Sequence, residues 1–183
     1  MRGAPIQLLM PFRPRHALAA ASLASALLVP SAAQAAGSGC AQASARPASI
    51  SVAAANRATL CLLNLERRRH RLRPLRENAK LDRAARGHSR SMVRRHYFGH
   101  GDFAGRIRRA GYRGWTLGEN IAWGSLQWST PAAIVDMWMH SPGHRANILR
   151  PQFREIGIGI AVGAPQRGVG GAATYTTDFG KPA

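Results

Sequence analysis

The chain has 183 residues, of which 26 are Lys or Arg and 8 are Asp or Glu, giving a formal net charge of +18 at pH 7. Such a surface attracts polyanions over long range, so we expect an anionic cell-envelope polymer or lipid as a partner. The arginines are scattered and no aromatic-interleaved motif accompanies them, which argues against nucleic acid as the intended partner. An arginine-biased composition, spread over a solvated surface, is the alternative explanation.

The first 35 residues have the pattern of an export signal. A basic start precedes an apolar run over 17–29, and Ala33-Gln34-Ala35 supplies an Ala-x-Ala cleavage site. The run is shorter than the roughly 20 residues that a membrane-spanning helix needs. We therefore expect a signal peptide over 1–35 and a secreted protein, extracellular or periplasmic, with no transmembrane segment after cleavage. A retained membrane anchor is the alternative.

Residues 36–54 are rich in Ala, Ser and Gly and predict a flexible N-terminal arm. The two cysteines, Cys40 and Cys61, lie in this arm and just beyond it. An even number of cysteines in an oxidising compartment favours a disulfide between them. Two unpaired thiols, or lipid modification of Cys40 behind Gly39, are the alternatives.

Apolar periodicity predicts helices first and strands last. We expect helices over about 56–69, 78–95 and 103–110, a helix that begins at Thr130-Pro131, a short helix carrying His144, and strands over about 156–162 and 172–179. The arginines around Glu66 are expected to face out, and His88 is expected to be a hydrogen-bonded core residue. The order of elements indicates an α+β fold, with one domain over 55–183.

Three short, glycine-bounded segments carry the candidate chemistry: Tyr97-Phe98-Gly99-His100, Gly118-Glu119-Asn120 and Ser141-Pro142-Gly143-His144. Glycine permits backbone angles that other residues resist, so we interpret the segments as bends around a site. Two imidazoles and a carboxylate suit a zinc-like cation or a general acid–base pair. Asn120 and Asn147 are expected to fix loops. Because the candidate serines lack a Gly-x-Ser-x-Gly turn, acyl-enzyme chemistry is not expected.

Together with Ile156-Gly157-Ile158-Gly159, these motifs resemble the bacterial type of the CAP superfamily, which contains cysteine-rich secretory, antigen 5 and pathogenesis-related 1 proteins and is also known as the SCP-like extracellular domain. The resemblance extends from Glu66 to Phe179. It implies a three-layer α-β-α sandwich with a small, mainly antiparallel sheet. It also implies a central cavity that can hold a divalent cation such as zinc.

By motif position, the resemblance places His100, Glu119, His144 and Ser141 on that cavity. It implies that His100 and His144 are metal ligands and that Glu119 is a third candidate. Ser141 stands where animal and plant members carry a further acid. A serine supplies no fixed charge, so the resemblance implies weaker metal binding than a four-ligand cage.

We therefore expect a secreted binding module, with a cavity for a divalent cation or a small apolar ligand and a cationic surface for the envelope. The alternative is a metal-assisted, protease-like hydrolase. In that hydrolase His100 and His144 would hold the metal, and Glu119 would ligate it or activate its water. The missing fourth acid favours the binding module, because fewer groups remain to divide the ligand and base roles.

Overall fold

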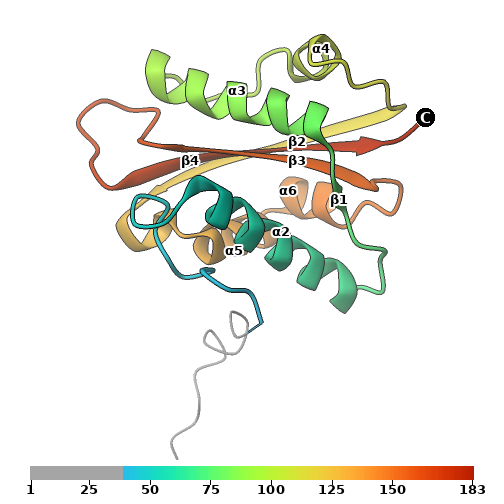
Figure 1. Ribbon diagram of the computed structural model, residues 1–183, viewed down its shortest axis with the longest axis horizontal. Coiled ribbons are helices and arrows are strands. Elements are labelled where there is room, and N and C mark those ends of the chain that lie inside the picture. The colour runs from blue at the N-terminus through green and yellow to red at the C-terminus, as the bar shows by residue number, and fades with distance from the viewer. Residues whose placement is uncertain (1–38) are drawn as a thin grey trace, which may run out of the picture. The chain divides into compact units, whose positions relative to one another are not determined.

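The computed structural model describes residues 39–183, so the expected signal peptide over 1–35 lies outside the described residues. The helices are α2 (Val52–Arg69), α3 (Ala79–Arg95), α4 (Phe103–Arg109), the 3-10 helix η1 (Leu126–Ser129), α5 (Pro131–Met139) and α6 (Pro142–Ile148). The strands are β1 (Arg76–Glu77), β2 (Thr116–Ser125), β3 (Glu155–Val162) and β4 (Ala172–Lys181). The sheet lies between α3 and α4 on one side and α2, α5 and α6 on the other (Figure 1). The predicted α+β class and three-layer sandwich are therefore confirmed.

The sheet has the order β1-β3-β4-β2. Antiparallel pairing joins β4 to both β3 and β2, whereas the two-residue β1 pairs with β3 in parallel. Neither β1 nor β2 was predicted from the sequence. The segment around Glu119, interpreted as a bend, is a ten-residue strand paired with β4 along its whole length. Cross-strand pairing outweighs the turn preference of Gly118 and Gly124.

One face of the sheet packs against α2, α5 and α6, and we call it the apolar face. Its buried side chains come from every second residue of β3 and β4, as the two-residue period of a strand requires. They include Ile156, Ile158, Ile160, Tyr175 and Phe179, which form one cluster with Leu63 and Trp138. The indole of Trp138 donates to Ile121 O at 3.2 Å, so the largest buried side chain is also hydrogen-bonded to β2.

The opposite face packs against α3 and α4, and we call it the polar face. Here β3 presents Gly157 and Gly159, which lie against the backbone of α3. A Cβ atom at Gly157 would lie 2.0 Å from the carbonyl carbon of Leu81, and one at Gly159 would lie 2.2 Å from that of Ala85. The alternating Ile-Gly motif therefore has a packing reason: isoleucines fill the apolar face and glycines admit α3.

Helix α2 begins at Val52, earlier than predicted, because the side chain of Ser51 accepts a hydrogen bond from Ala54 N at 3.1 Å. The prediction that the arginines around Glu66 face out is wrong for Arg67, which is fully buried. Its guanidinium donates to the carbonyls of Arg73, Ile148, Arg150 and Phe153. Burial, with a smaller effect of Arg154, lowers the pKa of Arg67 to about 10, so it stays charged at neutral pH.

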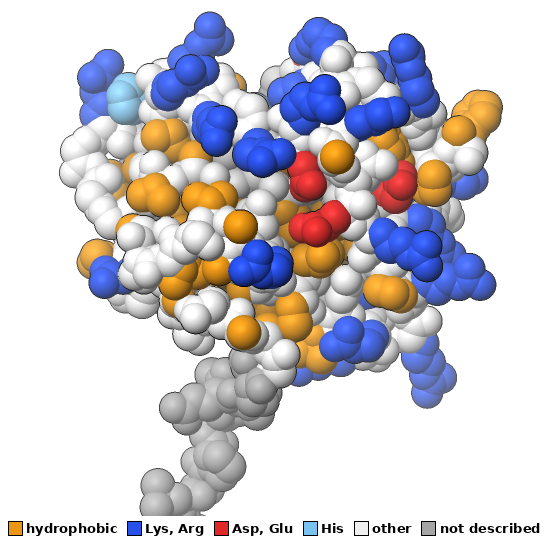
Figure 2. Space-filling model, in the orientation of Figure 1, with side chains coloured by type: hydrophobic (Ala, Val, Ile, Leu, Met, Phe, Trp, Pro, Cys, Tyr) orange, Lys and Arg blue, Asp and Glu red, His pale blue; other side chains and the backbone are white. Residues whose placement is uncertain are grey.

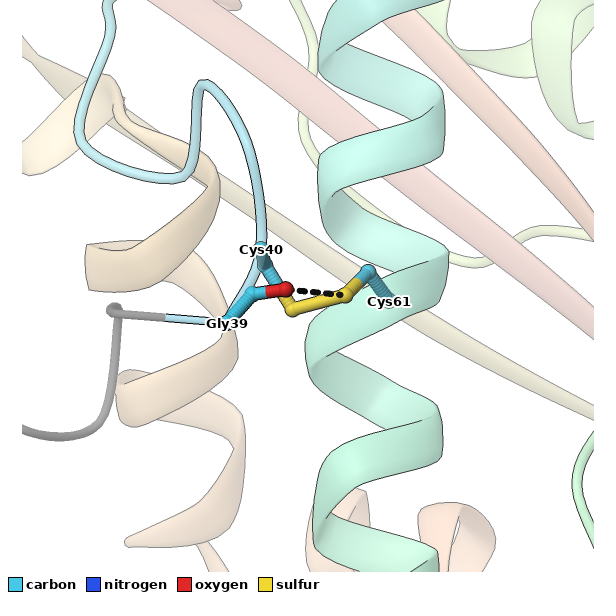
Figure 3. The surroundings of a disulfide bond; sticks show 3 residues. All are labelled: Gly39, Cys40 and Cys61. Atoms are coloured by element: carbon cyan, nitrogen blue, oxygen red, sulfur yellow. Dashed lines mark hydrogen bonds between the residues drawn. A yellow bond between two sulfur atoms is a disulfide. The ribbon is translucent and has the colours of Figure 1, made fainter.

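The predicted disulfide between Cys40 and Cys61 is confirmed, with the two Cα atoms 5.7 Å apart (Figure 3). It ties the segment before α2 to the middle of that helix and excludes both alternatives for these cysteines. A second anchor comes from Ala43, whose carbonyl accepts from Ala132 N at 2.9 Å. Among residues 39–183, no helix has the length and apolar character needed to cross a membrane.

Candidate functional site

Glu119 is the centre of a buried polar cluster on the polar face. Strand β2 carries it inward, and its side chain is 1% exposed. One carboxylate oxygen accepts a hydrogen bond from His100 Nδ1 at 2.8 Å, and the other accepts from the guanidinium of Arg106. Both oxygens of the carboxylate are therefore engaged by side chains of the protein.

His100 follows α3, in the loop that precedes α4. Its side chain is 50% exposed, so one edge of the ring meets Glu119 and the other meets solvent. A carboxylate only accepts hydrogen bonds, so Nδ1 must carry the proton of this bond. In the neutral imidazole, Nε2 then keeps its lone pair for a ligand.

Arg106 extends from α4 and connects this loop to Glu119. Asp102 caps α4 by accepting from Gly105 N at 2.8 Å, which fixes the start of the helix. The Arg106 guanidinium also donates to His100 O at 3.1 Å. Arg106 was not predicted as a site residue, because one arginine among so many carries no distinguishing pattern.

Asp178 is the second acid of the cluster and was also missed. It is the cross-strand partner of Glu119 on β4 and is fully buried. Neither of its oxygens finds a donor among the described residues. Burial and the neighbouring Glu119 raise the pKa of Asp178 well above its usual value, which favours the protonated, uncharged form of this acid.

His88, on α3, closes the cluster on the side of that helix. As expected, it is a buried, hydrogen-bonded histidine: Nε2 lies 3.0 Å from Gly99 O, and Nδ1 lies 3.5 Å from the Tyr97 hydroxyl. Burial lowers the pKa of His88, which keeps it neutral. Its Nε2 is also 4.0 Å from a Glu119 oxygen, a proximity that the sequence did not indicate.

His144 lies on α6, next to the cluster. Asn120 of β2 donates to His144 O at 3.0 Å, and Asn147 of α6 donates to Glu119 O at 3.1 Å. These two bonds dock α6 onto the strand that carries Glu119. Burial, and to a smaller extent the charge of His100, lower the pKa of His144, which favours its neutral form.

Ser141, the remaining predicted cavity residue, precedes α6 as its N-cap residue, and its hydroxyl makes no capping hydrogen bond. Within residues 39–183, no group of three or more His, Cys, Asp or Glu side chains is arranged to hold a metal ion. The donors that remain free are the two imidazoles of His100 and His144, since Glu119 is engaged on both oxygens. Two imidazoles are fewer ligands than the four of a closed structural zinc site.

Solved structures support the architecture. An extracellular protein containing an SCP domain from Bacillus anthracis str. Ames superposes with a TM-score of 0.57 at 27% identity, over 72% of this chain and 44% of that one. An outer surface protein from Borrelia burgdorferi gives a TM-score of 0.57 at 18% identity, over 68% of this chain and 90% of that one. The second likeness concerns the fold alone.

Sequence relatives point the same way. The uncharacterized protein YkwD of Bacillus subtilis (strain 168) is 39% identical over 114 residues, which are 60% of this chain and 43% of YkwD. The uncharacterized membrane protein YlbC of the same strain is 32% identical over 106 residues, 55% of this chain and 30% of YlbC. The chain thus spans less than half the length of these curated relatives. The family model of the cysteine-rich secretory proteins, CAP, matches residues 60–177, and this chain belongs to that family.

Proposed function

We propose that this chain is an exported CAP-domain binding module. In this proposal His100 and His144 take a divalent cation such as zinc, and the arginine-rich surface holds the protein on anionic envelope polymers. The observation that carries the proposal is the hydrogen bond from His100 Nδ1 to the buried Glu119. A carboxylate behind a histidine fixes its tautomer and aims Nε2 outward, as in many metal sites.

The other residues of the cluster support a binding role for the histidines. Arg106 donates to the Glu119 carboxylate and holds it in place, so that His100 needs no rearrangement to present Nε2. The lowered pKa of His144 favours the unprotonated form that a cation requires. The remaining coordination positions would be left to water or to a group of a bound partner.

The envelope part of the proposal has separate support. The arginines of α3 and α4 are mostly exposed, which places positive charge on the outer side of the polar-face helices. The apolar run and Ala-x-Ala site near the start support export, and the Bacillus anthracis neighbour is described as extracellular. Adhesion of this kind weakens steeply with salt, so cosedimentation with anionic phospholipid vesicles at rising ionic strength tests it.

Zinc titration by calorimetry tests the cation site. We expect the oxidised mature protein to bind one ion and His100→Ala/His144→Ala to bind none. The matched control is His70→Ala/His140→Ala, which removes two exposed imidazoles outside the cluster and should leave binding intact. Failure of the wild type to bind, or equal loss in both double variants, would contradict the proposal.

The hydrolase remains the second candidate, and the His100–Glu119 pair is what favours it. A histidine oriented by a carboxylate is the usual form of a general base. Glu119 itself is less suited to activate a metal-bound water, since both of its oxygens already accept hydrogen bonds. Zinc-dependent cleavage of a fluorogenic peptide library, abolished in His144→Ala, would favour the hydrolase and overturn the binding-module proposal.

A further inference from the structure

A groove of about 570 Å³ runs along the outer edge of β3, away from the histidine cluster. Helix α3 forms one wall and the start of α2 forms the other, so the groove spans both faces of the sheet at its edge. The α3 wall carries Arg86, Arg90 and Arg94, and Val52 and Ala53 line the α2 wall. The cation site of the proposed function uses none of these residues, whereas the three arginines are part of the exposed positive charge of α3.

The floor of the groove is an unpaired strand edge. Strand β1 pairs only with Glu155 and Ile156, and the chain then turns into α3. At the next outward position, Ile158 N donates to Asp82 at 2.8 Å, and Ile158 O accepts from Asn56 at 3.2 Å. Side chains from both walls therefore take the place of a neighbouring strand at Ile158.

Beyond Ile158, side chains no longer take the place of a neighbouring strand. Backbone groups of alternate residues point to opposite sides of a strand, so those of Ile160 and Val162 point into the groove, as those of Ile158 do. No partner for them occurs among residues 39–183. The side-chain oxygen of Asn56, a lining residue of the same groove, also lacks a hydrogen-bond donor there. The groove thus combines free backbone donors and acceptors with an apolar floor.

The charged side chains that line the groove are all positive. The three arginines stand one helical turn apart on α3, and no acidic residue lines the groove. Figure 2 shows Lys and Arg side chains gathered over α3, above a band of apolar side chains. The nearest acid on the helix, Asp82, is engaged by Ile158 N. An occupant must therefore be anionic on the side that faces α3.

We propose that this groove binds an extended, acidic peptide segment, which adds to β3 as a further strand. Polypeptide backbone supplies the alternating N–H and C=O groups that an open edge requires, and neither a lipid headgroup nor a sugar polymer has this spacing. Successive side chains of the added strand would point to α3 and to α2 in turn. The recognised pattern is acidic residues alternating with small apolar ones.

The probe is a fluorescent peptide of about ten residues in which Glu and Val alternate, a length typical of long strands. We expect anisotropy to report saturable binding to the wild type. Val162→Pro removes an outward N–H at a half-exposed position and should weaken binding about tenfold, or about 1.4 kcal/mol. Val162→Ala keeps the N–H and is the matched control.

A second pair of variants separates the groove from general electrostatics. Arg90→Glu/Arg94→Glu should abolish binding, while Arg83→Glu/Arg108→Glu, with the same charge change at exposed positions outside the groove, should retain it. Equal loss in both pairs, or equal affinity for the same peptide N-methylated at alternate residues, would overturn strand addition. Groove-dependent binding of anionic lipid vesicles that is unaffected in Val162→Pro would do the same. Concentration-dependent dimerisation that is lost in Val162→Pro would also overturn the proposal, because a second copy of this chain would then occupy the groove.

Discussion

The two faces of the sheet use the same strands for different purposes. On the apolar face, β3 and β4 contribute isoleucines and aromatic rings to one large hydrophobic cluster. On the polar face, the intervening residues are glycines that admit α3 and acids that form the site. Because strand side chains alternate between faces, the core residue Phe179 and the site residue Asp178 are direct neighbours on β4. Most of the stability is therefore expected from one face and the chemistry from the other.

The largest loss of stability should follow from removing a large side chain from the hydrophobic cluster on the apolar face. Trp138→Ala removes the largest fully buried side chain and its hydrogen bond to Ile121 O, and should lower the free energy of unfolding by about 4 kcal/mol. Urea denaturation of the oxidised protein measures it. Met137→Ala, a neighbour on the same helix that is 36% exposed, should cost less than about 1 kcal/mol. Similar losses in the two variants would mean that the cluster is not the main source of stability.

On the polar face, the corresponding variant adds a methyl group to a tightly packed contact instead of removing a side chain. Gly159→Ala would place a methyl group 2.2 Å from the Ala85 carbonyl carbon, so α3 must shift, at a cost of about 2–3 kcal/mol. Gly87→Ala on α3 is the control, because its added Cβ meets nothing within 4 Å. It should raise the stability by about 0.5–1 kcal/mol through helix propensity. If Gly159→Ala were as harmless as Gly87→Ala, the close contact of α3 with β3 would be wrong.

A smaller, pH-dependent effect should come from Asp178→Asn. The pKa of Asp178 is raised in the folded protein, so its contribution to stability is complete below the unfolded pKa and is lost as the pH rises through the folded pKa. Asn cannot ionise and avoids that loss. We expect the variant to be about 1 kcal/mol more stable than the wild type at about pH 8, and no more stable at about pH 4.

Thermal unfolding over this pH range gives the comparison. Glu77→Gln, at an exposed position of β1, controls for the general effect of removing one acid. A loss of stability in Asp178→Asn at high pH would show that Asp178 is ionised in the folded protein and needed as a charge. Arg106 and His100 would then have to balance the negative charges of both Glu119 and Asp178.

The smallest effect on stability should come from the exposed side of the cluster. His100→Gln removes a half-exposed imidazole and should change the free energy of unfolding by less than about 1 kcal/mol. Zinc binding should nevertheless be lost, since one of only two free imidazoles in the described cluster is gone. A large drop in stability together with retained zinc binding would assign His100 to the structure instead of the site.

Local patterns were enough to predict the main helices, the last two strands, the disulfide and the family. They were not enough for β1, which has only two residues, or for β2, where glycines hid a strand. Arg67 was placed outside because its burial depends on four carbonyls that only the fold brings together. Asp178 had a signal in the sequence, because it is the one acid in the predicted strand over 172–179, whose other residues are apolar or carry hydroxyl groups. Its pairing with Glu119 follows from the β2–β4 register, which the sequence did not reveal.

The most direct test of the central claim is the tautomer of His100, measured from its imidazole nitrogen resonances by NMR. At about pH 8 we predict the proton on Nδ1 and a zinc-dependent shift of Nε2. Glu119→Gln should weaken the preference for that tautomer. A proton on Nε2, or nitrogen resonances that ignore both zinc and the Glu119 substitution, would contradict the claim that Glu119 aims His100 at a ligand.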